Sequence, residues 1–210
     1  MRYRIFVILT GLLFEATINP AFSGLPADSL WTLEKDKNAV KVFTRKAEDV
    51  DFKEFRAVTI VQASIPALVA LVKDVESYPE WVENVKSSKL LEVINDNEEV
   101  YYNEIKVPWP LSNRDNIVAA KIVKDTESGI VRIIMKGKPD YIPEKSGLVR
   151  IPVARGFWEF VPLGNGETKV TLQYLADPGG NVPAWIVNMF VVDGPYKTFL
   201  NMKELLKKEF

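Results

Sequence analysis

The chain has 210 residues, of which 47% are hydrophobic and 26% are charged, and its formal net charge is −1. This length and composition suit one globular domain with its own core, and the charge balance does not indicate a nucleic-acid-binding or strongly basic membrane surface. Cysteine and histidine are both absent, which excludes disulfides, thiol nucleophiles and histidine general bases and leaves almost no zinc or haem chemistry.

The first 23 residues are typical of a secretory signal peptide. Two arginines precede an apolar run from Ile5 to Phe14, and Ala21-Phe22-Ser23 carries the small residues that a signal peptidase requires. The run is too short for a helix to cross a hydrocarbon layer of about 30 Å. An uncleaved anchor and a cytosolic tail remain alternatives. We expect a signal peptide at 1–23 and a secreted, periplasmic domain at 24–210.

The mature chain begins with β-structure. From Leu30 the pattern predicts three strands, of which 40–44 and 55–61 are rich in β-branched and aromatic residues. Ser64 then has the side chain of a helix N-cap, and apolar residues follow it at helical spacing. The proline-containing stretch Ser77–Trp81 ends this helix and starts a second short one.

A run of β-strands fills the middle of the chain. Short polar turns separate the strands, so the pattern favours antiparallel pairing without crossover helices. No internal repeat and no domain linker is present. The six predicted strands are 88–94, 99–106, 114–123, 130–136, 147–161 and 168–176.

A long apolar helix is predicted at the C-terminus. Large apolar residues recur there at steps of three and four: Trp185, Met189, Val192, Tyr196, Phe199, Met202 and Leu206. Asp193-Gly194-Pro195 interrupts this pattern, and a proline in a helix interior predicts a kink or a fresh helix N-terminus. The fold class is therefore α+β, with a curved antiparallel sheet of about nine strands wrapped around one long C-terminal helix. Such a sheet leaves internal volume unless large side chains fill it.

Several segments match known families. Asp74–Trp81 resembles the D-x-x-x-Y-P-x-W stretch of the helix-grip superfamily, which includes polyketide cyclases and the birch-pollen-allergen fold. Further segments together resemble the START (StAR-related lipid transfer) domain over about residues 28–208: Glu104, Pro110…Arg114-Asp115, Pro143…Gly147, Pro162-Leu163 and Asp177…Pro183-Ala184-Trp185. The resemblance implies a nine-stranded sheet closed by the C-terminal helix, around a tunnel that holds one lipid or sterol.

The resemblance also suggests charged groups inside the tunnel. Family members with a sterol role carry an acidic residue on one strand and an arginine on the next, both facing the tunnel. Glu104 matches the acidic position, but the arginine position is Ala120, which puts sterol specificity in question. By strand alternation Arg114, Asn116, Val118 and Ala120 share one face, so Arg114 would supply the charge from another depth.

Two interpretations of Arg114-Asp115 stay open. In one, the two residues form a structural pair that fixes the loop at the start of a strand. In the other, Arg114 meets a ligand head group or Glu104, since an uncompensated charge in an apolar interior costs several kcal/mol. Glu104 is correspondingly either a tunnel group or a solvated edge residue.

Other candidate tunnel residues are large and mostly aromatic. They form either the tunnel wall or ordinary core: Tyr102, Trp109, Phe157, Trp158, Trp185, Met189 and Tyr196. Gly194 and Pro195 are the candidate hinge of a lid formed by the terminal helix, together with the loop Gly137–Gly147.

The expected function is to bind a single lipid or other hydrophobic ligand and to carry it across an aqueous compartment without catalysis. We expect a monomer with transient membrane contact and no cofactor, metal or nucleic acid. One alternative is a helix-grip enzyme of the cyclase or hydrolase branch, with Glu104, Asp115 or Tyr102 as acid or base. The other is a ligand-sensing binding protein of the cell envelope.

Overall fold

The structure, a computed structural model, describes residues 30–48 and 50–209. The predicted signal peptide at 1–23 lies outside the described residues. Ten strands and a set of helical segments follow one another along the chain: β1 (Thr32–Lys37), β2 (Val40–Lys46), β3 (Lys53–Gln62), α1 (Ile65–Lys73), η3 (Val75–Ser77), α2 (Tyr78–Trp81), β4 (Val85–Asn95), β5 (Glu98–Ile105), β6 (Arg114–Lys124), β7 (Val131–Gly137), β8 (Val149–Arg150), β9 (Ala154–Gly164), β10 (Glu167–Ala176), α3 (Ala184–Asn188), η4 (Met189–Asp193) and α4 (Gly194–Glu209).

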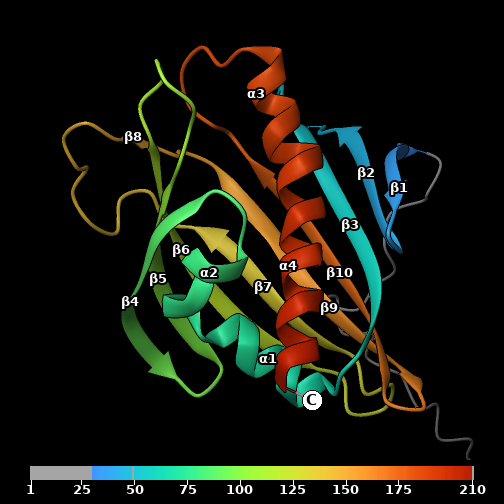
Figure 1. Cartoon of the computed structure of the whole chain (residues 1–210). Helices are drawn as coiled ribbons and strands as arrows, with labels where there is room; N and C mark the ends of the chain where they lie inside the picture. The colour runs from blue at the N-terminus through green and yellow to red at the C-terminus, as the bar shows by residue number, and fades with distance from the viewer. Residues whose placement is uncertain (1–29, 49, 210) are drawn as a thin grey trace, which may run out of the picture.

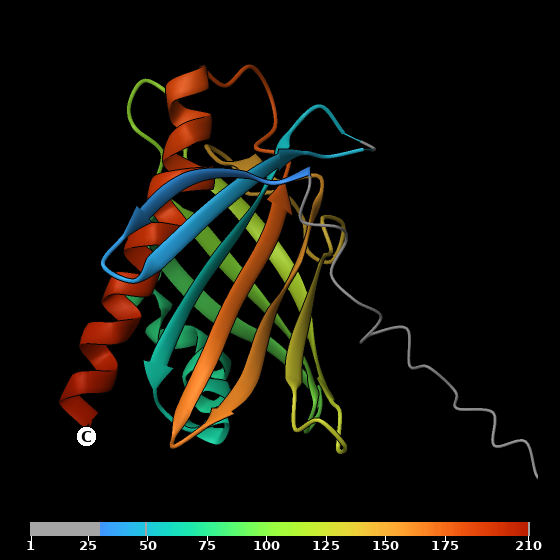
Figure 2. The same ribbon diagram turned by 90° about the vertical axis from the view of Figure 1, so that its right-hand side faces the viewer.

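The strands form one sheet in the order β1-β2-β3-β10-β9-β7-β6-β5-β4, and all neighbours in this order are antiparallel (Figures 1 and 2). The short β8 pairs parallel with β6. The predicted α+β class and antiparallel sheet are confirmed. The predicted strand 147–161 is divided into β8 and β9, and Pro152 lies in the gap, where its missing N–H interrupts a ladder.

The two short helices after the third strand are also confirmed. Ser64 caps α1, because its hydroxyl accepts a hydrogen bond from the backbone N–H of Ala67 at 3.3 Å. Pro66 and Pro79 each stand at the start of a helix, α1 and α2, where the missing N–H would have no partner in any case.

The C-terminal helical rod consists of α3, η4 and α4 and runs across one face of the sheet, which we call the inner face (Figures 1 and 2). Side chains tie the rod to the β1–β2 hairpin. Lys35 forms an ion pair with Asp193 at 2.5 Å, and the Asn38 amide donates to the Tyr196 hydroxyl at 2.9 Å. Further along, the Lys203 ammonium donates to the Asn38 carbonyl at 3.2 Å. The edge hairpin therefore follows the helix along several turns.

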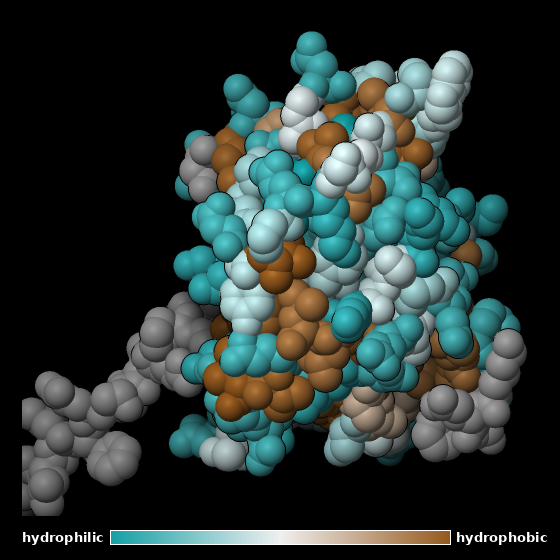
Figure 3. Space-filling model, turned by 90° about the vertical axis from the view of Figure 1, so that its left-hand side faces the viewer, coloured by the Kyte–Doolittle hydropathy of each residue, from teal (hydrophilic) through white to brown (hydrophobic). Residues whose placement is uncertain are grey.

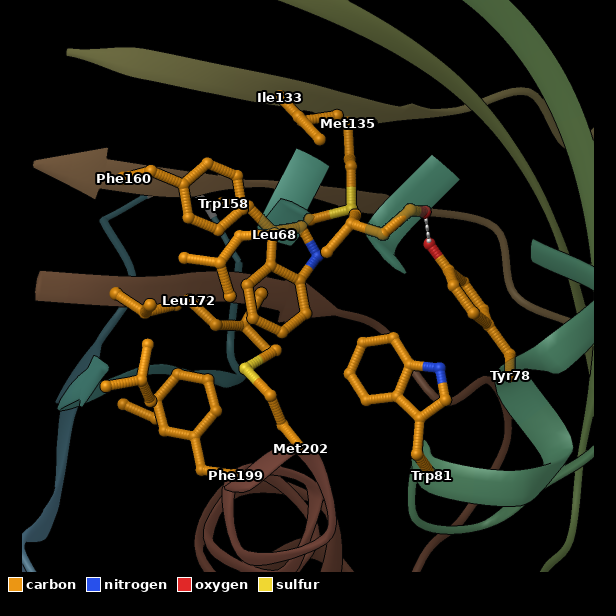
Figure 4. Close-up of a cluster of buried hydrophobic side chains, with 14 of the residues drawn as sticks. Leu68, Tyr78, Trp81, Ile133, Met135, Trp158, Phe160, Leu172, Phe199 and Met202 are labelled. Atoms are coloured by element: carbon orange, nitrogen blue, oxygen red, sulfur yellow. Dashed lines mark hydrogen bonds between the residues drawn. The ribbon is translucent and has the colours of Figure 1, made fainter. Parts of the chain in front are cut away.

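Large side chains fill part of the space between helix and sheet. Figure 4 shows this core cluster, in which Trp158 of β9 lies among residues of the sheet, the two short helices and α4. The Trp158 ring stacks on Phe160 with centroids 6.4 Å apart, and it lies 5.8 Å from the ring of Phe199 and 6.1 Å from that of Trp81. Aromatic side chains of this size dominate core energetics. This half of the interior is filled.

The opposite, outer face of the sheet carries a buried ion pair. Arg150 of β8 donates to both carboxylate oxygens of Asp115 of β6, with Nε–Oδ1 2.9 Å and Nη2–Oδ2 3.0 Å. Its other three N–H groups donate to the carbonyls of Pro139, Ile142 and Pro143. The hydrogen bonds to Asp115 raise the pKa of Arg150. All five guanidinium N–H groups are thus used, and the loop 138–148 is held against the outer face.

We expect Asp115→Asn to lower the free energy of unfolding by about 3–5 kcal/mol, because it leaves the buried Arg150 charge without its counter-ion. Asp51→Asn is the matched control: Asp51 pairs with Lys46 at 3.2 Å, but both side chains are exposed, and such pairs contribute little. Urea unfolding followed by tryptophan fluorescence measures both. Equal small losses in the two variants would show that the buried pair does not secure this fold.

Candidate functional site

An internal cavity of about 220 Å³ lies between the inner face of the sheet and the first half of the helical rod. It lies directly beside the aromatic core cluster, whose residues Met135, Trp158 and Leu172 also form part of its wall. For scale, an engineered cavity of about 150 Å³ is large enough to bind benzene. Its walls come from the starts of β3, β4 and β6, from β5, β7, β9 and β10, from α2 and the segment after it, from the loop after β10, and from α3 to α4.

The walls are mainly apolar. The sheet contributes Met135, Trp158 and Leu172, and the helical rod contributes Phe190 and Val191. Side chains of a strand alternate between the two faces, so the wall residues of β5, β6 and β10 stand two positions apart along each strand. Methionine and aromatic side chains adapt to an irregular ligand surface. The arrangement suits a hydrophobic ligand.

The rod is widened at the cavity instead of broken. The alternative of a fresh helix N-terminus at Asp193-Gly194-Pro195 is wrong: the backbone stays helical and forms the π-helical segment η4, in which the Gly194 N–H bonds to the carbonyl of Met189. The predicted kink stays a prediction. Proline has no N–H and its ring collides with the carbonyl four residues earlier, and a π-turn accommodates both effects. Gly194 and Pro195 line the cavity, as does Val191.

Arg114 marks the polar end of the cavity. Its side chain is 5% exposed and donates to three backbone carbonyls: Nε to Pro178 at 3.1 Å, Nη1 to Ser112 at 2.5 Å and Nη2 to Gly179 at 3.4 Å. Burial lowers the pKa of this guanidinium. Arg114 forms no ion pair among the described residues, so the alternative in which it meets Glu104 is wrong, and carbonyl dipoles of Ser112 and of the loop before α3 surround the guanidinium instead.

Two asparagines and a tyrosine lie beside Arg114. Asn103 of β5 is paired in register with Asn116 of β6, and the Asn116 amide donates to the hydroxyl of Tyr174 on β10 at 2.9 Å. All three line the cavity. Burial raises the pKa of Tyr174 to about 12, so the hydroxyl keeps its proton at neutral pH. The side-chain oxygen of Asn103 is buried and has no hydrogen-bond partner among the described residues.

Some of the predicted site residues line the cavity. They are Arg114, Asn116, Trp158, Gly194 and Pro195. Val118 and Ala120 share the face of Arg114 and Asn116, as alternation predicts, but they are buried in the filled half of the interior, beside Tyr101 and Met135. Whether any of these residues contacts a ligand stays a prediction.

Tyr102 and Glu104 lie on the outer face, and their predicted place on the tunnel wall is corrected. The inward residues of β5 are Tyr101, Asn103 and Ile105. Because neighbouring residues of a strand point to opposite faces, Tyr102 and Glu104 point outward. Glu104 pairs with Lys86 at 2.8 Å and accepts from the Asn113 amide at 2.9 Å, and these hydrogen bonds lower its pKa.

Tyr102 belongs to a small outer cluster with Val100 and Ile117. The Lys145 ammonium lies 3.6 Å from the centroid of the Tyr102 ring, which places the loop 138–148 over this cluster. No residue of the predicted lid loop Gly137–Gly147 lines the cavity. That loop covers the outer face, so its expected role as a lid over the cavity is wrong.

Phe157 also faces outward, because Trp158 points inward and neighbours alternate; the Arg132 guanidinium lies 5.4 Å from its ring. Trp185, Met189 and Tyr196 are on the rod but not on its cavity side. Trp185 is 57% exposed. The cavity side is formed by residues one or two positions away in sequence, since the rod is apolar nearly all round and its periodicity does not identify the inward face.

Asn103 and Tyr174 were not predicted as site residues. The sequence around Asn103 reads Val-Tyr-Tyr-Asn-Glu-Ile, in which both faces carry large side chains, so no alternation identifies the inner one. Glu99 was also missed: it is the inward-facing acidic residue of β5, beside a small second pocket, and burial raises its pKa. Its position is at the filled end of the interior, away from Arg114.

The described residues contain no group of three or more histidine, cysteine, aspartate or glutamate side chains placed to hold a metal ion. Within the same residues, no helix has the length and apolar character needed to span a membrane.

Comparisons with known proteins give a consistent family. A family model described as START domain matches residues 25–208. An uncharacterized protein of Pseudomonas aeruginosa is 32% identical over 204 residues, which cover 95% of this chain and 100% of that protein. The phosphatidylcholine transfer protein of Rattus norvegicus is 27% identical over 179 residues, which cover 83% of this chain and 81% of that protein.

Solved structures of lipid transfer proteins are similar to this chain as well. A STAR-related lipid transfer protein of Xanthomonas axonopodis has a TM-score of 0.77 at 34% identity. The match covers 85% of this chain and 99% of that chain. The human StAR-related lipid transfer protein 5 has a TM-score of 0.73 at 19% identity, with 87% of this chain and 89% of that protein covered. The second likeness concerns the fold alone.

Proposed function

We propose that this chain, which belongs to the START domain family, binds one lipid in its internal cavity and carries it through water as a monomer. The observation on which the proposal rests is the apolar cavity of about 220 Å³ between the sheet and the π-helical segment of the rod. Two relatives support the same function, since one is a phosphatidylcholine transfer protein and the other a STAR-related lipid transfer protein.

The free energy of moving a lipid from a membrane into water explains why a carrier is useful. An acyl chain of about sixteen carbons loses roughly 13 kcal/mol on leaving an apolar phase for water, at about 0.8 kcal/mol per CH₂ group. Unassisted desorption is therefore slow. Apolar walls offset most of this cost, and no covalent bond has to change. A whole acyl chain would also require the rod to move outward, since the aromatic cluster fills the other half of the interior.

The position of the carboxylates supports a non-catalytic role. The candidate acid–base residues of an enzyme, Tyr102, Glu104 and Asp115, all lie on the outer face, and Asp115 is held by Arg150. Glu83 is the acidic residue among those that line the cavity in the described chain, and it pairs with Lys197 at 3.0 Å. None of the three candidate acid–base residues therefore lines the cavity.

Two exposed tryptophans favour membrane contact at the cavity end of the molecule. Trp109, in the loop between β5 and β6, is 90% exposed, and Trp185 at the start of the rod is 57% exposed. That loop and α3 lie at the same end of the molecule (Figures 1 and 2), and hydrophobic residues reach the surface near the top of Figure 3. Tryptophan is enriched at membrane–water interfaces. We propose that this end faces the membrane when the lipid enters or leaves.

The secreted, periplasmic location is a proposal from the sequence of residues 1–23, in which a charged start, an apolar run and small residues follow one another. Mass spectrometry of the chain recovered from a bacterial periplasm would identify the first residue after cleavage. Recovery of the intact chain from the cytoplasm would contradict the location.

We expect the purified protein to accelerate transfer of an acyl-labelled phospholipid from donor to acceptor vesicles and to elute with bound lipid. Val191→Phe, which places a larger ring in the cavity, should lower the bound fraction roughly tenfold, because overpacking costs about 1–3 kcal/mol. Val192→Phe is the matched control, since Val192 is not on the cavity wall. A wild-type protein that neither binds nor transfers lipid would overturn the proposal, and recovery of a converted lipid would indicate an enzyme.

The double variant Trp109→Ser, Trp185→Ser should weaken binding to phospholipid vesicles by about tenfold, because each indole contributes apolar contact at the interface. Leu163→Ser is the control: Leu163 is 47% exposed and belongs to the end of β9, at the opposite end of the molecule. Vesicle co-sedimentation measures the effect. An equal loss in the control would mean that docking does not depend on the cavity end.

Pro195→Ala should slow lipid exchange more than it changes equilibrium affinity. Alanine restores the missing N–H and favours a regular helix by about 3 kcal/mol over proline in a helix interior, so the rod opens less readily. Stopped-flow transfer and equilibrium binding give the two quantities. Pro66→Ala, in the first turn of α1, is the control. Parallel changes in rate and affinity would argue against a hinge at Pro195.

A further inference from the structure

We propose that the polar end of the cavity seats the anionic head group of the lipid, so that the protein prefers a phosphate or carboxylate lipid without a positive charge over phosphatidylcholine. The inference rests on the proposed lipid-binding function and adds the chemical class of the ligand. It is carried by Arg114 together with Asn103, Asn116 and Tyr174, which line one end of the cavity.

Charge is the first argument. The charged residues on the described cavity wall are Lys53, Glu83 and Arg114. Lys53 lies 3.4 Å from the carboxylate of Glu34, and Glu83 pairs with Lys197. Within the described chain Arg114 forms no ion pair, although it is 5% exposed. A buried guanidinium without a counter-ion favours any ligand that supplies one.

The geometry of the guanidinium is the second argument. Arginine has five N–H donors, and Arg114 directs three of them to carbonyls of Ser112, Pro178 and Gly179. The three bonds fix the orientation of the planar group against the loop before α3. Two N–H groups, one on each terminal nitrogen, remain available to an anion, and a fork of this kind matches the oxygens of phosphate or carboxylate.

The neutral neighbours complete the site. Because Asn116 donates to the Tyr174 oxygen, the Tyr174 hydroxyl can direct its own proton toward a ligand acceptor. Asn103, directly across from Asn116 in the strand register, has a buried oxygen without a donor in the described structure. A head group that combines an anion with a hydroxyl, such as phosphoglycerol, satisfies both the donors and this acceptor.

A choline head group fits the same walls poorly. Its quaternary ammonium has no N–H to donate to Asn103, and the described wall offers it no unpaired carboxylate. Placed near Arg114, it would meet a like charge in an apolar surrounding, which opposes binding. The chain is similar to phosphatidylcholine transfer proteins in sequence, but the charge of Arg114 and the free acceptor of Asn103 favour a different head group at this end of its cavity.

The test uses the whole purified protein and donor vesicles of one phosphatidylcholine matrix, so that the vesicle surface is the same in every arm. Each vesicle carries a trace of one acyl-labelled lipid: phosphatidylglycerol, phosphatidylcholine or a free fatty acid. The protein is separated by gel filtration and its bound label is counted. We expect at least roughly tenfold more phosphatidylglycerol than phosphatidylcholine: both carry the phosphate, but only the glycerol head group can donate a hydrogen bond to Asn103, and it brings no positive charge beside Arg114. Retention of the fatty acid as well would show that a carboxylate suffices.

Variants identify the site. Arg114→Gln should bring the phosphatidylglycerol to phosphatidylcholine ratio close to one, whereas Arg155→Gln, the same charge change on the exposed side of β9, should keep the wild-type ratio. Asn103→Leu should lower phosphatidylglycerol retention without touching the loop contacts of Arg114, which covers the case in which Arg114→Gln fails to fold.

Two outcomes separate the inference from the function that it rests on. Equal or greater retention of phosphatidylcholine by the wild-type protein would overturn the head-group assignment while leaving lipid binding intact. Absence of label in every arm would overturn lipid binding itself. An unchanged ratio in a folded Arg114→Gln protein would also overturn the assignment.

Discussion

A single sheet has to remove its inner face from water, and one long helical rod is the main element available to cover it. The rod covers β2, β3 and the central strands, and the two short helices close the other end together with the aromatic cluster around Trp158. Where those large side chains stop, the space between rod and sheet is not filled, and this is where the cavity lies. The cavity that can hold a ligand and the packed core that stabilises the fold therefore lie side by side between the rod and the sheet.

The separation of the two sheet faces explains the Arg114-Asp115 pair. Successive residues of a strand point to opposite faces, so Arg114 enters the cavity while Asp115 meets Arg150 on the outer side. The two side chains do different work. Asp115 and Arg150 hold the loop 138–148 in place, and Arg114 holds the loop that leads into the rod by its carbonyls. Both loops are therefore anchored at the start of β6.

The rod itself combines attachment and adaptability. Contacts of Lys35, Asn38 and Lys203 fix it to the first hairpin, while the π-helical segment before Pro195 replaces the regular hydrogen-bond ladder next to the cavity. A π-turn is a less regular part of a helix, and such turns are frequent at functional sites. The same segment that covers the ligand space is therefore the part of the rod with the least regular backbone.

The amino-acid sequence was enough to establish the α+β class, the antiparallel strands, the two short helices and the terminal helix, because alternation, caps and prolines are local signals. It also placed Arg114 and Asn116 on one face. It did not determine which face of β5 is inward, since large side chains stand on both, nor which side of an apolar helix meets the cavity. The three-dimensional packing was needed to show that Asn103 and Tyr174 face the cavity, that Tyr102, Glu104 and Phe157 do not, and that Arg150 is the partner of Asp115. These facts depend on register and helix rotation between elements far apart in the chain, which no local pattern encodes.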